Sequence, residues 1–395
     1  MATNTLLTPA LITKETLVML ENNLVAAAKV NRQFENQFVK IGSTITVRKP
    51  NKFTVSSGPG LQIQNVTEPS TSITISNQKH VDFQFAGQDL TLVIEEFSER
   101  YLKPAASSLA NQIDNDVLTL YNQVFNLVGT SGTPPNNYSF LAAVGQRMDE
   151  GAVPQDGRVL ILGPAAYWAL DTALIGVYVR SVAEPALKGF LAAIANFEIY
   201  LDQNIQSQTW GAFAGSGRVN SANQTGSQII TNNWTASQQL FNVGDVIQFA
   251  GVHAVNPKSR QSTGALANFV VTAAVSADSG GNATISISPS IVTSGAYQTV
   301  DASPANLAAV TEPTSPAASG TYAQNIAFVR DAFGLCTVPL ELPDGVDFRA
   351  REMYKNVSMT MIRAFDINNY VYPCRIDILY GVAAYYPELA VRLTS

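Results

Sequence analysis

The sequence predicts an α+β fold, arranged as two or more domains or as one elongated domain with insertions, and three observations support this. Apolar residues recur at helical spacing along residues 97–128. Apolar and polar residues alternate with a period of two within residues 41–86 and again within residues 351–395. The composition changes near residue 207, where charged residues become rare. At 395 residues, the chain also exceeds the usual size of one hydrophobic core.

Two helices are expected in the first third of the chain. Residues 8–30 have Thr8 as a possible N-cap and Pro9 at the first helical position, which predicts an amphipathic, detachable arm. Residues 97–128 predict a long spine helix, whose outer side holds Asn, Gln, Ser and Asp more than Lys and Glu, so we expect that side to face other protein. The apolar stripe of this helix consists of Leu102, Ala106, Leu109, Ile113, Val117, Leu120, Val124 and Leu127.

Strands are expected near both ends of the chain. Residues 41–86 indicate a long hairpin whose tip, Ser56–Pro69, is too rich in Gly and Pro to belong to a core. A hairpin of this length is not stable by itself in water, so it requires a surface to lie on. Residues 351–395 indicate two more strands, joined through Asp366–Pro373.

The middle of the chain, residues 139–206, mixes the two element types. Val159–Leu162 is expected to be a buried strand, Pro164–Leu174 a helix, and Phe197–Leu201 another strand. This order indicates an α/β or α+β unit.

Residues 207–320 differ sharply from the rest. Seven charged residues occur in these 114 positions, while Ser, Thr, Asn, Gly and Ala dominate, so helix is not expected. Short apolar clusters predict strands, and Ser279–Asn282 suits a hairpin turn. We therefore predict a small inserted β domain with Thr311–Gly320 as its exit linker. The apolar clusters are 229–230, 243–255, 269–275 and 285–292.

Composition and charge exclude several classes of protein. The net charge is −6 and no run of Lys or Arg is present, so sequence-specific nucleic-acid binding is not expected. The most apolar run, residues 163–179, is interrupted by Asp171 and is too short to span a bilayer. The N-terminus lacks the features of a signal peptide, which favours a cytoplasmic origin. Only 14% of residues are charged, so the surface is either uncharged polar or covered by partners.

Residues with catalytic or metal-binding chemistry are few and scattered. His80 and His253 lie in strand-like segments without the spacing of a zinc site. Cys336 and Cys374 match no nucleophile signature and are most simply buried thiols, although a disulfide stays open. The Gly-rich segment 215–227 lacks the Gly-Lys-Ser/Thr ending of a phosphate loop. We therefore expect no catalytic site, no metal and no cofactor.

Paired carboxylates have simple structural explanations. Glu95 and Glu96 precede the long helix, where negative charge suits the positive end of the helix dipole. Asp114 and Asp116 would point to different sides of the same helix.

Basic residues in the hairpin admit two explanations. Lys49 and Lys52 either contact a carboxylate of a neighbouring molecule or keep an exposed strand edge from aggregating, and the second explanation is preferred unless a partner is shown.

Four segments, in this order, resemble one known family. They are HVDFQFAGQDLTLVIEEFSERYLKPAASSLANQIDNDV (80–117), GFLAAIANFEIYLDQNI (189–205), NIAFVRDAFGLCTVPLELP (325–343) and CRIDILYGVAAYYPELAVRL (374–393). The chain resembles the P22-type coat proteins of tailed bacteriophages, whose subunits have the HK97-like capsid fold with an extra inserted domain. The resemblance spans most of the chain.

The resemblance implies a domain map and a set of candidate contacts between subunits. The candidates are Lys49, Lys52, Phe53, Glu95, Glu96 and Arg100. The map is an N-terminal arm (1–40), an extended loop reaching over a neighbouring subunit (41–86), a peripheral domain with the spine helix (87–138), an axial domain (139–206 and 321–350), an inserted β domain (207–320) and returning peripheral strands (351–395).

The function implied is that of a major capsid protein, assembling with copies of itself as hexamers and pentamers into the icosahedral shell around a double-stranded DNA genome. A scaffolding protein, a portal and packaged DNA bound without sequence specificity are the implied partners. No membrane is expected, and assembly is expected in the bacterial host cytoplasm. The alternative is a secreted or surface β-rich adhesin or carbohydrate-binding protein, suggested by the Ser, Thr and Asn content; an enzyme is a more distant third.

Overall fold

The computed structural model describes residues 9–33, 44–64, 68–86, 102–174, 191–346, 348–354, 357–369 and 371–395. The chain divides into two compact units, each described here by itself. Unit 1 comprises residues 1–47, 70–117 and 333–385, and unit 2 comprises residues 48–69, 118–332 and 386–395.

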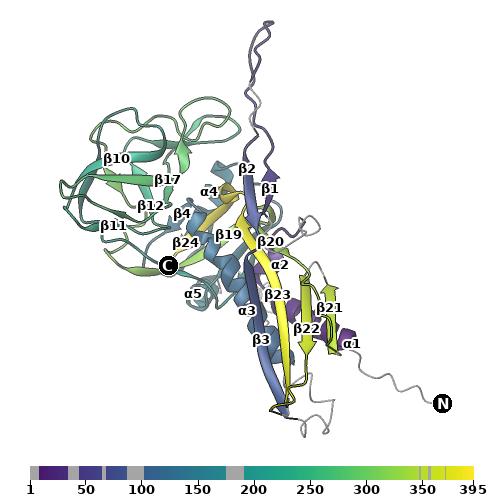
Figure 1. Cartoon of the computed structure of the whole chain (residues 1–395). Helices are drawn as coiled ribbons and strands as arrows, with labels where there is room; N and C mark the ends of the chain where they lie inside the picture. The colour runs from purple at the N-terminus through teal and green to yellow at the C-terminus, as the bar shows by residue number, and fades with distance from the viewer. Residues whose placement is uncertain are drawn as a thin grey trace. The chain divides into compact units, whose positions relative to one another are not determined.

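Unit 1 is built on an antiparallel five-stranded sheet with the long strand β23 in its centre (Figure 1). β23 pairs with β20, β22 and β3, and β21 pairs with β22. The side chains of Met359, Met361, Ile376 and Ile378 are at most 1% exposed, which confirms the two alternating strands predicted near the C-terminus. The strand bounds are β3 (Asn77–Ala86), β20 (Phe333–Thr337), β21 (Phe348–Tyr354), β22 (Val357–Arg363) and β23 (Val371–Ala384).

The prediction of one long hairpin over residues 41–86 is wrong for the second half of that segment. β1 (Thr44–Arg48) pairs only with β2 (Ser70–Thr74), as a small two-stranded sheet. β3 instead pairs with β23 along its whole length, from Asn77 opposite Tyr380 to Ala86 opposite Val371. A ten-residue strand gains more ladder hydrogen bonds from the fourteen-residue β23 than from the short β1.

The spine helix is shorter than predicted. α3 runs from Lys103 to Leu118 and is followed by the 3₁₀ helix η5 (Thr119–Gln123). The chain then becomes extended, and β4 (Leu127–Gly129) pairs in parallel with β24 (Ala390–Thr394). Because β4 completes the edge of a sheet, tertiary pairing overrides the helical spacing in its last part. Within α3 the predicted stripe is buried, since the side chains of Leu102, Ala106, Leu109, Ile113 and Val117 are at most 3% exposed.

The described part of the N-terminal segment, residues 9–33, packs within unit 1. α1 (Pro9–Asn23) packs against β21 and β22, and its Leu17 and Leu20 are fully buried. The single helix predicted for residues 8–30 is interrupted, because a second short helix, α2 (Ala26–Lys29), begins after Val25.

A buried carboxylate explains where α2 begins. Asp114 of α3 accepts hydrogen bonds from the backbone N–H groups of Val25, at 2.8 Å, and Ala27, at 2.7 Å. The first-turn donors of a helix need such acceptors, and no side-chain cap is present at Val25 itself.

Unit 2 contains a seven-stranded mixed sheet with the main path β4-β24-β19-β5-β7-β6, and β8 also pairs with β19. β5 and β7 are parallel neighbours, as are β24 and β4, while the other pairs are antiparallel. The bounds are β5 (Arg158–Leu162), β6 (Leu191–Ile194), β7 (Phe197–Leu201), β8 (Ser207–Thr209) and β19 (Thr321–Val329).

Helices α4 (Tyr138–Glu150) and α5 (Pro164–Leu174) pack on this sheet through a shared apolar core. Asn137 caps α4, since its side-chain oxygen accepts from the backbone N–H of Ser139 at 3.0 Å. The predicted strand at 159–162, helix at 164–174 and strand at 197–201 are all confirmed.

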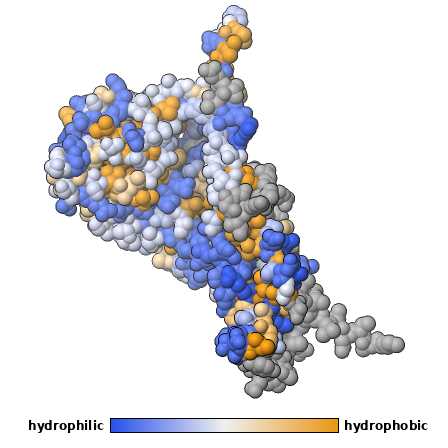
Figure 2. Space-filling view, viewed as in Figure 1, coloured by the Kyte–Doolittle hydropathy of each residue, from blue (hydrophilic) through white to orange (hydrophobic). Residues whose placement is uncertain are grey.

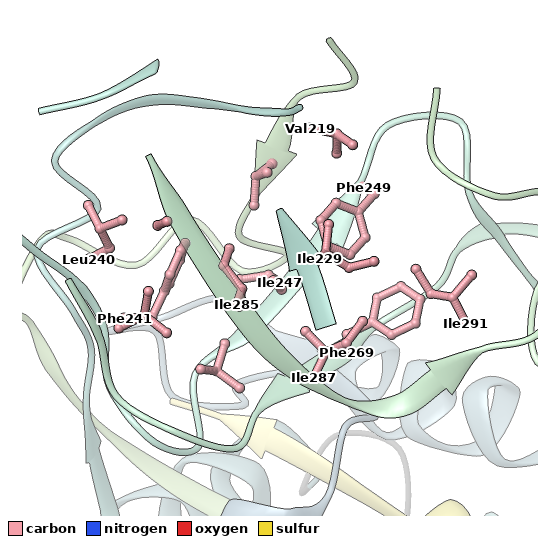
Figure 3. Packing of buried hydrophobic residues seen from close by; sticks show 14 of the residues in the cluster. Val219, Ile229, Leu240, Phe241, Ile247, Phe249, Phe269, Ile285, Ile287 and Ile291 are labelled. Atoms are coloured by element: carbon pink, nitrogen blue, oxygen red, sulfur yellow. The ribbon is translucent and has the colours of Figure 1, made fainter. Parts of the chain in front are cut away.

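The second part of unit 2 is a six-stranded sheet in the order β18-β12-β15-β17-β10-β9 (Figure 1). Its own apolar core contains Phe249 and Phe269, whose rings lie 5.4 Å apart, with Ile247, Ile285 and Ile287 around them (Figure 3). The strands predicted from the apolar clusters in this part are confirmed as several short ones. They are β9 (Gly215–Val219), β10 (Gly226–Trp234), β11 (Gln239–Phe241), β12 (Val246–Phe249), β13 (His253–Val255), β14 (Ser262–Leu266), β15 (Phe269–Val271), β16 (Val275–Ser276), β17 (Ala283–Ile291) and β18 (Val310–Thr311). Short 3₁₀ helices η6 (Arg330–Ala332) and η7 (Pro387–Leu389) complete the chain.

Candidate assembly surface

A narrow ribbon lies between β1 and β2, and we define it as residues 48–69, of which 65–67 are outside the described part. Its two arms are joined at the base, where the Lys49 N–H donates to the carbonyl of Pro69 at 2.8 Å. Arg48 and Glu68 form an exposed ion pair at 3.2 Å. Further from the base, the backbone N–H of Thr54 donates a hydrogen bond to the side-chain oxygen of Gln64 at 2.9 Å. These few contacts hold the arms together without any core.

Large apolar side chains on the ribbon are exposed to solvent. The exposed fractions are 61% for Phe53, 100% for Val55, 89% for Leu61 and 84% for Ile63. Figure 2 shows hydrophobic colour near the tip of the ribbon, at the top of the view. Phe53 and Val55 are two residues apart, as are Leu61 and Ile63, which in extended chain places each pair on one face. Burying one such side chain would contribute about 1.5–3 kcal/mol, so the ribbon is suited to contact with another protein surface.

The tip of the ribbon has a backbone that requires glycine. Gly58 has a φ of +97°, a conformation that side chains with a Cβ rarely adopt. Pro59 follows it, and a Cβ added at Gly58 or Gly60 would meet no atom within 4 Å. The turn therefore depends on the local Gly-Pro-Gly sequence and not on packing.

The base of the ribbon contacts its own chain. The Lys49 ammonium lies 4.8 Å from the centre of the Tyr386 ring. Burial lowers the pKa of Lys49, while the nearby Glu388 raises it. Lys52 borders a cavity of about 400 Å³ that is also lined by Glu388 and Tyr297. Lys49 thus has partners in its own subunit, which the sequence did not indicate.

The other sequence-predicted contact residues divide into two groups. Phe53 lies on the ribbon, close to Lys52 in sequence, and is exposed. Glu95, Glu96 and Arg100 lie outside the described residues. Val55, Leu61 and Ile63 were not among the predicted contacts, although apolar residues that alternate around a Gly-Pro-Gly turn are a signal visible in the sequence.

Groups with catalytic or metal-binding chemistry are dispersed or engaged in structural contacts. Within the described ranges, no three His, Cys, Asp or Glu residues are grouped so that they could hold a metal ion. His80 lies 3.2 Å from Asp82, and His253 lies 2.8 Å from Asp301. The described part of the chain also has no helix of the length and apolar character needed to cross a bilayer.

Neither cysteine forms a disulfide, and both are buried in the structure. Burial raises the pKa of the Cys374 thiol to about 11.

Asp114 and Asp116 have the different environments that their spacing predicts. Asp114 is buried and caps α2, whereas Asp116 accepts a hydrogen bond from the Tyr380 hydroxyl at 2.6 Å. Burial and this carboxylate raise the pKa of Tyr380. Both carboxylates therefore serve structural roles.

Two buried ionisable residues, Arg392 and Asp245, lie where β24 of one sheet of unit 2 meets the segment before β12 of the other. Arg392 of β24 is fully buried, and its Nη2 donates to the carbonyl of Gly244 at 2.9 Å. The carboxylate of Asp245 accepts from the backbone N–H groups of Gly211, at 2.9 Å, and Asn242, at 2.7 Å. Burial raises the pKa of Asp245 to about 6, although these hydrogen bonds and Arg392 lower it. No local signal in the sequence indicates this pair.

Comparisons with known proteins identify one family. A model of the family described as "P22 coat protein - gene protein 5" matches residues 1–394. A search of curated proteins finds no match.

Several solved phage structures are similar over most of their length. One from Mycobacterium phage Che8 has 13% identity and a TM-score of 0.49, covering 94% of this chain and 90% of the other. The capsid of Ralstonia phage GP4 has 6% identity and a TM-score of 0.46, covering 92% and 86%. The capsid of Helicobacter pylori bacteriophage KHP30 has 8% identity and a TM-score of 0.44, covering 90% and 85%. Because these TM-scores lie below 0.5, the assignment rests on the family match.

The family match confirms the resemblance and, with it, the predicted α+β, HK97-like capsid fold. Coat proteins are structural and are not a class of enzymes, and the alternative of a β-rich adhesin is not favoured. The chain belongs to the P22 coat protein family and is a major capsid protein of a tailed bacteriophage, a virion subunit that assembles with many copies of itself into a shell.

Proposed function

We propose that the ribbon, residues 48–69, reaches over a neighbouring subunit within hexamers and pentamers and buries its apolar side chains there. The observation that supports this is the exposure of Phe53, Val55, Leu61 and Ile63, all above 60% in the single subunit. Each subunit would use its ribbon on the next copy around a ring. Such head-to-tail contacts close into rings when the rotation between copies permits it.

The ribbon proposal is tested by removing apolar surface without changing the turn. Val55→Ser and Ile63→Ser together would remove about 2 kcal/mol or more of contact per subunit. The subunit concentration at which shells form should then rise at least tenfold, since about 1.4 kcal/mol corresponds to a factor of ten. Shell formation is measured by sedimentation and negative-stain electron microscopy over a dilution series.

A matched control is available elsewhere in unit 2. Ile230 on β10 is 49% exposed, and Ile230→Ser should leave the assembly concentration unchanged. If the double ribbon variant forms shells at the wild-type concentration, the ribbon is not the contact that we propose.

The domain map implied by the resemblance supplies further candidates. Lys52 and Phe53 on the ribbon, together with Glu95, Glu96 and Arg100, are proposed to contact neighbouring subunits. Charge-reversal pairs tested for mutual rescue of assembly would identify which of them meet across an interface.

The other expected partners follow from the role of the protein as the subunit of a capsid shell. We expect a scaffolding protein to guide assembly, a portal at one vertex and assembly in the host cytoplasm, without a membrane, cofactor or catalytic activity. The net charge of −6 without a basic run supports contact with packaged DNA that is independent of sequence. Expression with and without the other structural proteins of the same phage, followed by particle imaging, tests these partners.

A further inference from the structure

The base of the ribbon is attached to unit 2 at more than one point. Lys49 lies over the ring of Tyr386, and the Tyr297 hydroxyl is 3.4 Å from the side-chain oxygen of Asn51. Lys52 lines the cavity of about 400 Å³ together with Tyr297 and other residues of the segment 289–300. The ribbon base, residues 49–52, therefore contacts two segments that are distant from it in the sequence, one at Tyr386 and one at residues 289–300.

The surface that receives Lys49 is itself held in place. The backbone N–H of Tyr386 donates to the carbonyl of Ala332 at 3.1 Å, and its carbonyl accepts from the N–H of Leu389 at 2.9 Å. Glu388 lies two residues further along the chain, and its charge raises the pKa of Lys49. An ammonium over an aromatic ring, partly shielded from water, is a favourable arrangement.

The exposed apolar residues begin only beyond this attachment. Lys49 is half-buried, whereas Phe53 and the residues above it have no comparable contacts with the described part of the chain. A small rotation at the base of a long ribbon moves its tip by a large distance. The contacts of residues 49–52 therefore determine the position of the apolar side chains further along the ribbon.

We propose that Lys49 is a positioning residue: by binding the ring of Tyr386 of its own subunit, with Asn51 against Tyr297, it fixes the direction in which the ribbon reaches its neighbour. This rests on the proposed function of the ribbon. Lys49 then contributes to assembly without touching the neighbouring copy, and the segment 289–300 acts as a brace for the ribbon.

Proteolysis of the unassembled full-length subunit tests the attachment. Trypsin does not cleave efficiently before proline, so Lys49 is protected by Pro50. The bond after Lys52 is the informative site, and mass spectrometry of the fragments distinguishes its cleavage from cleavage after the exposed Arg48. Lys49→Met should accelerate cleavage after Lys52 about tenfold, because cleavage follows the population in which the base has detached. Lys49→Arg should restore the wild-type rate, since a guanidinium also binds an aromatic face and a carboxylate.

A second pair of variants tests the brace. Tyr297→Phe removes one hydroxyl and should accelerate the same cleavage about threefold. Tyr138→Phe, at an exposed tyrosine that begins α4, should not change it. The melting temperature of all four variants should stay within a degree or two of wild type, which separates detachment of the ribbon from loss of the fold.

Particle imaging tests the consequence for assembly. Lys49→Met should convert closed shells of one size into a mixture of sizes and open sheets, and Lys49→Arg should restore uniform shells. Unchanged cleavage rates, or uniform shells from Lys49→Met, would overturn the positioning role. Neither result affects the ribbon proposal, which fails only if the Val55→Ser, Ile63→Ser double variant assembles normally.

Discussion

Removal of the Asp114 carboxylate is expected to detach the N-terminal segment of unit 1 and to lower the stability of that unit by about 3–5 kcal/mol. Asp114 is 2% exposed and accepts hydrogen bonds from the backbone N–H groups of Val25, at 2.8 Å, and Ala27, at 2.7 Å. A hydrogen bond to a charged group contributes about 1.5–3 kcal/mol, and a buried donor left without its acceptor costs about 1–3 kcal/mol. Asp114→Ala loses both bonds at once.

Asp116→Ala is the matched control for this prediction. It lies two residues further along α3, is partly exposed, and bonds the Tyr380 hydroxyl instead of backbone donors. It also accepts a hydrogen bond from Gln112 at 2.7 Å and lies 3.7 Å from the Lys79 ammonium. We expect its removal to cost about 1–2 kcal/mol, because these contacts are made by side chains at a partly exposed site. Urea unfolding of the unassembled subunit gives both free energies.

Hydrogen exchange supplies a local readout for the same variants. The amides of Val25 and Ala27 should lose protection in Asp114→Ala and keep it in Asp116→Ala, because only the first removes their acceptor. The reasoning is refuted if Asp114→Ala costs no more than Asp116→Ala, or if these two amides remain protected in it.

Three further predictions concern single side chains. Cys374, buried and with its pKa raised to about 11, should react with a thiol reagent at pH 8 about a hundredfold more slowly in the folded subunit than after unfolding. Lowering the pH from 7.5 to 4.5 should raise the free energy of unfolding of wild type by about 2 kcal/mol relative to that of Asp245→Asn, as measured by urea titration. The reason is that the Asp245 carboxyl has a pKa of about 6 in the folded state and 3.8 in the unfolded state, so at pH 4.5 it is mostly protonated only when folded. Gly217→Ala should lower the free energy of unfolding by at least about 2 kcal/mol and shift the fluorescence of Trp234, because the new Cβ would lie 1.9 Å from the Trp234 ring. Gly60→Ala should have little effect on stability, because the space around Gly60 is open.

The sequence predicted best those elements whose signals are local. The helix at 164–174 was found with its correct bounds, because Pro164 begins it and its apolar residues keep helical spacing. The short strands within residues 207–320 were predicted from composition and from short apolar clusters. Elements fixed by distant partners were predicted less well. The helix expected over 97–128 ends at Leu118, because the residues after it pair with a strand at the other end of the chain.

The same distinction applies to the candidate assembly surface. Phe53 was among the candidate contacts that the resemblance implied, and its side chain is exposed on the ribbon. The partners of Lys49 could not be named, since Tyr386 is more than three hundred positions away and nothing near either residue indicates the other. Asp114 and Arg392 likewise acquire their roles only when the fold brings backbone groups to them.

The structure also changes where the free energy of assembly is expected to come from. Three elements were expected to find their contacts on other copies: the N-terminal segment, the spine helix and the hairpin. The described part of the first packs on β21 and β22, and the apolar stripe of the second is buried within unit 1. Among the described parts of these three elements, the ribbon is the one that keeps large apolar side chains in solvent. Folding of the subunit and assembly of the shell are therefore separable steps, because the core contacts form in the single chain and the ribbon contacts require a neighbour.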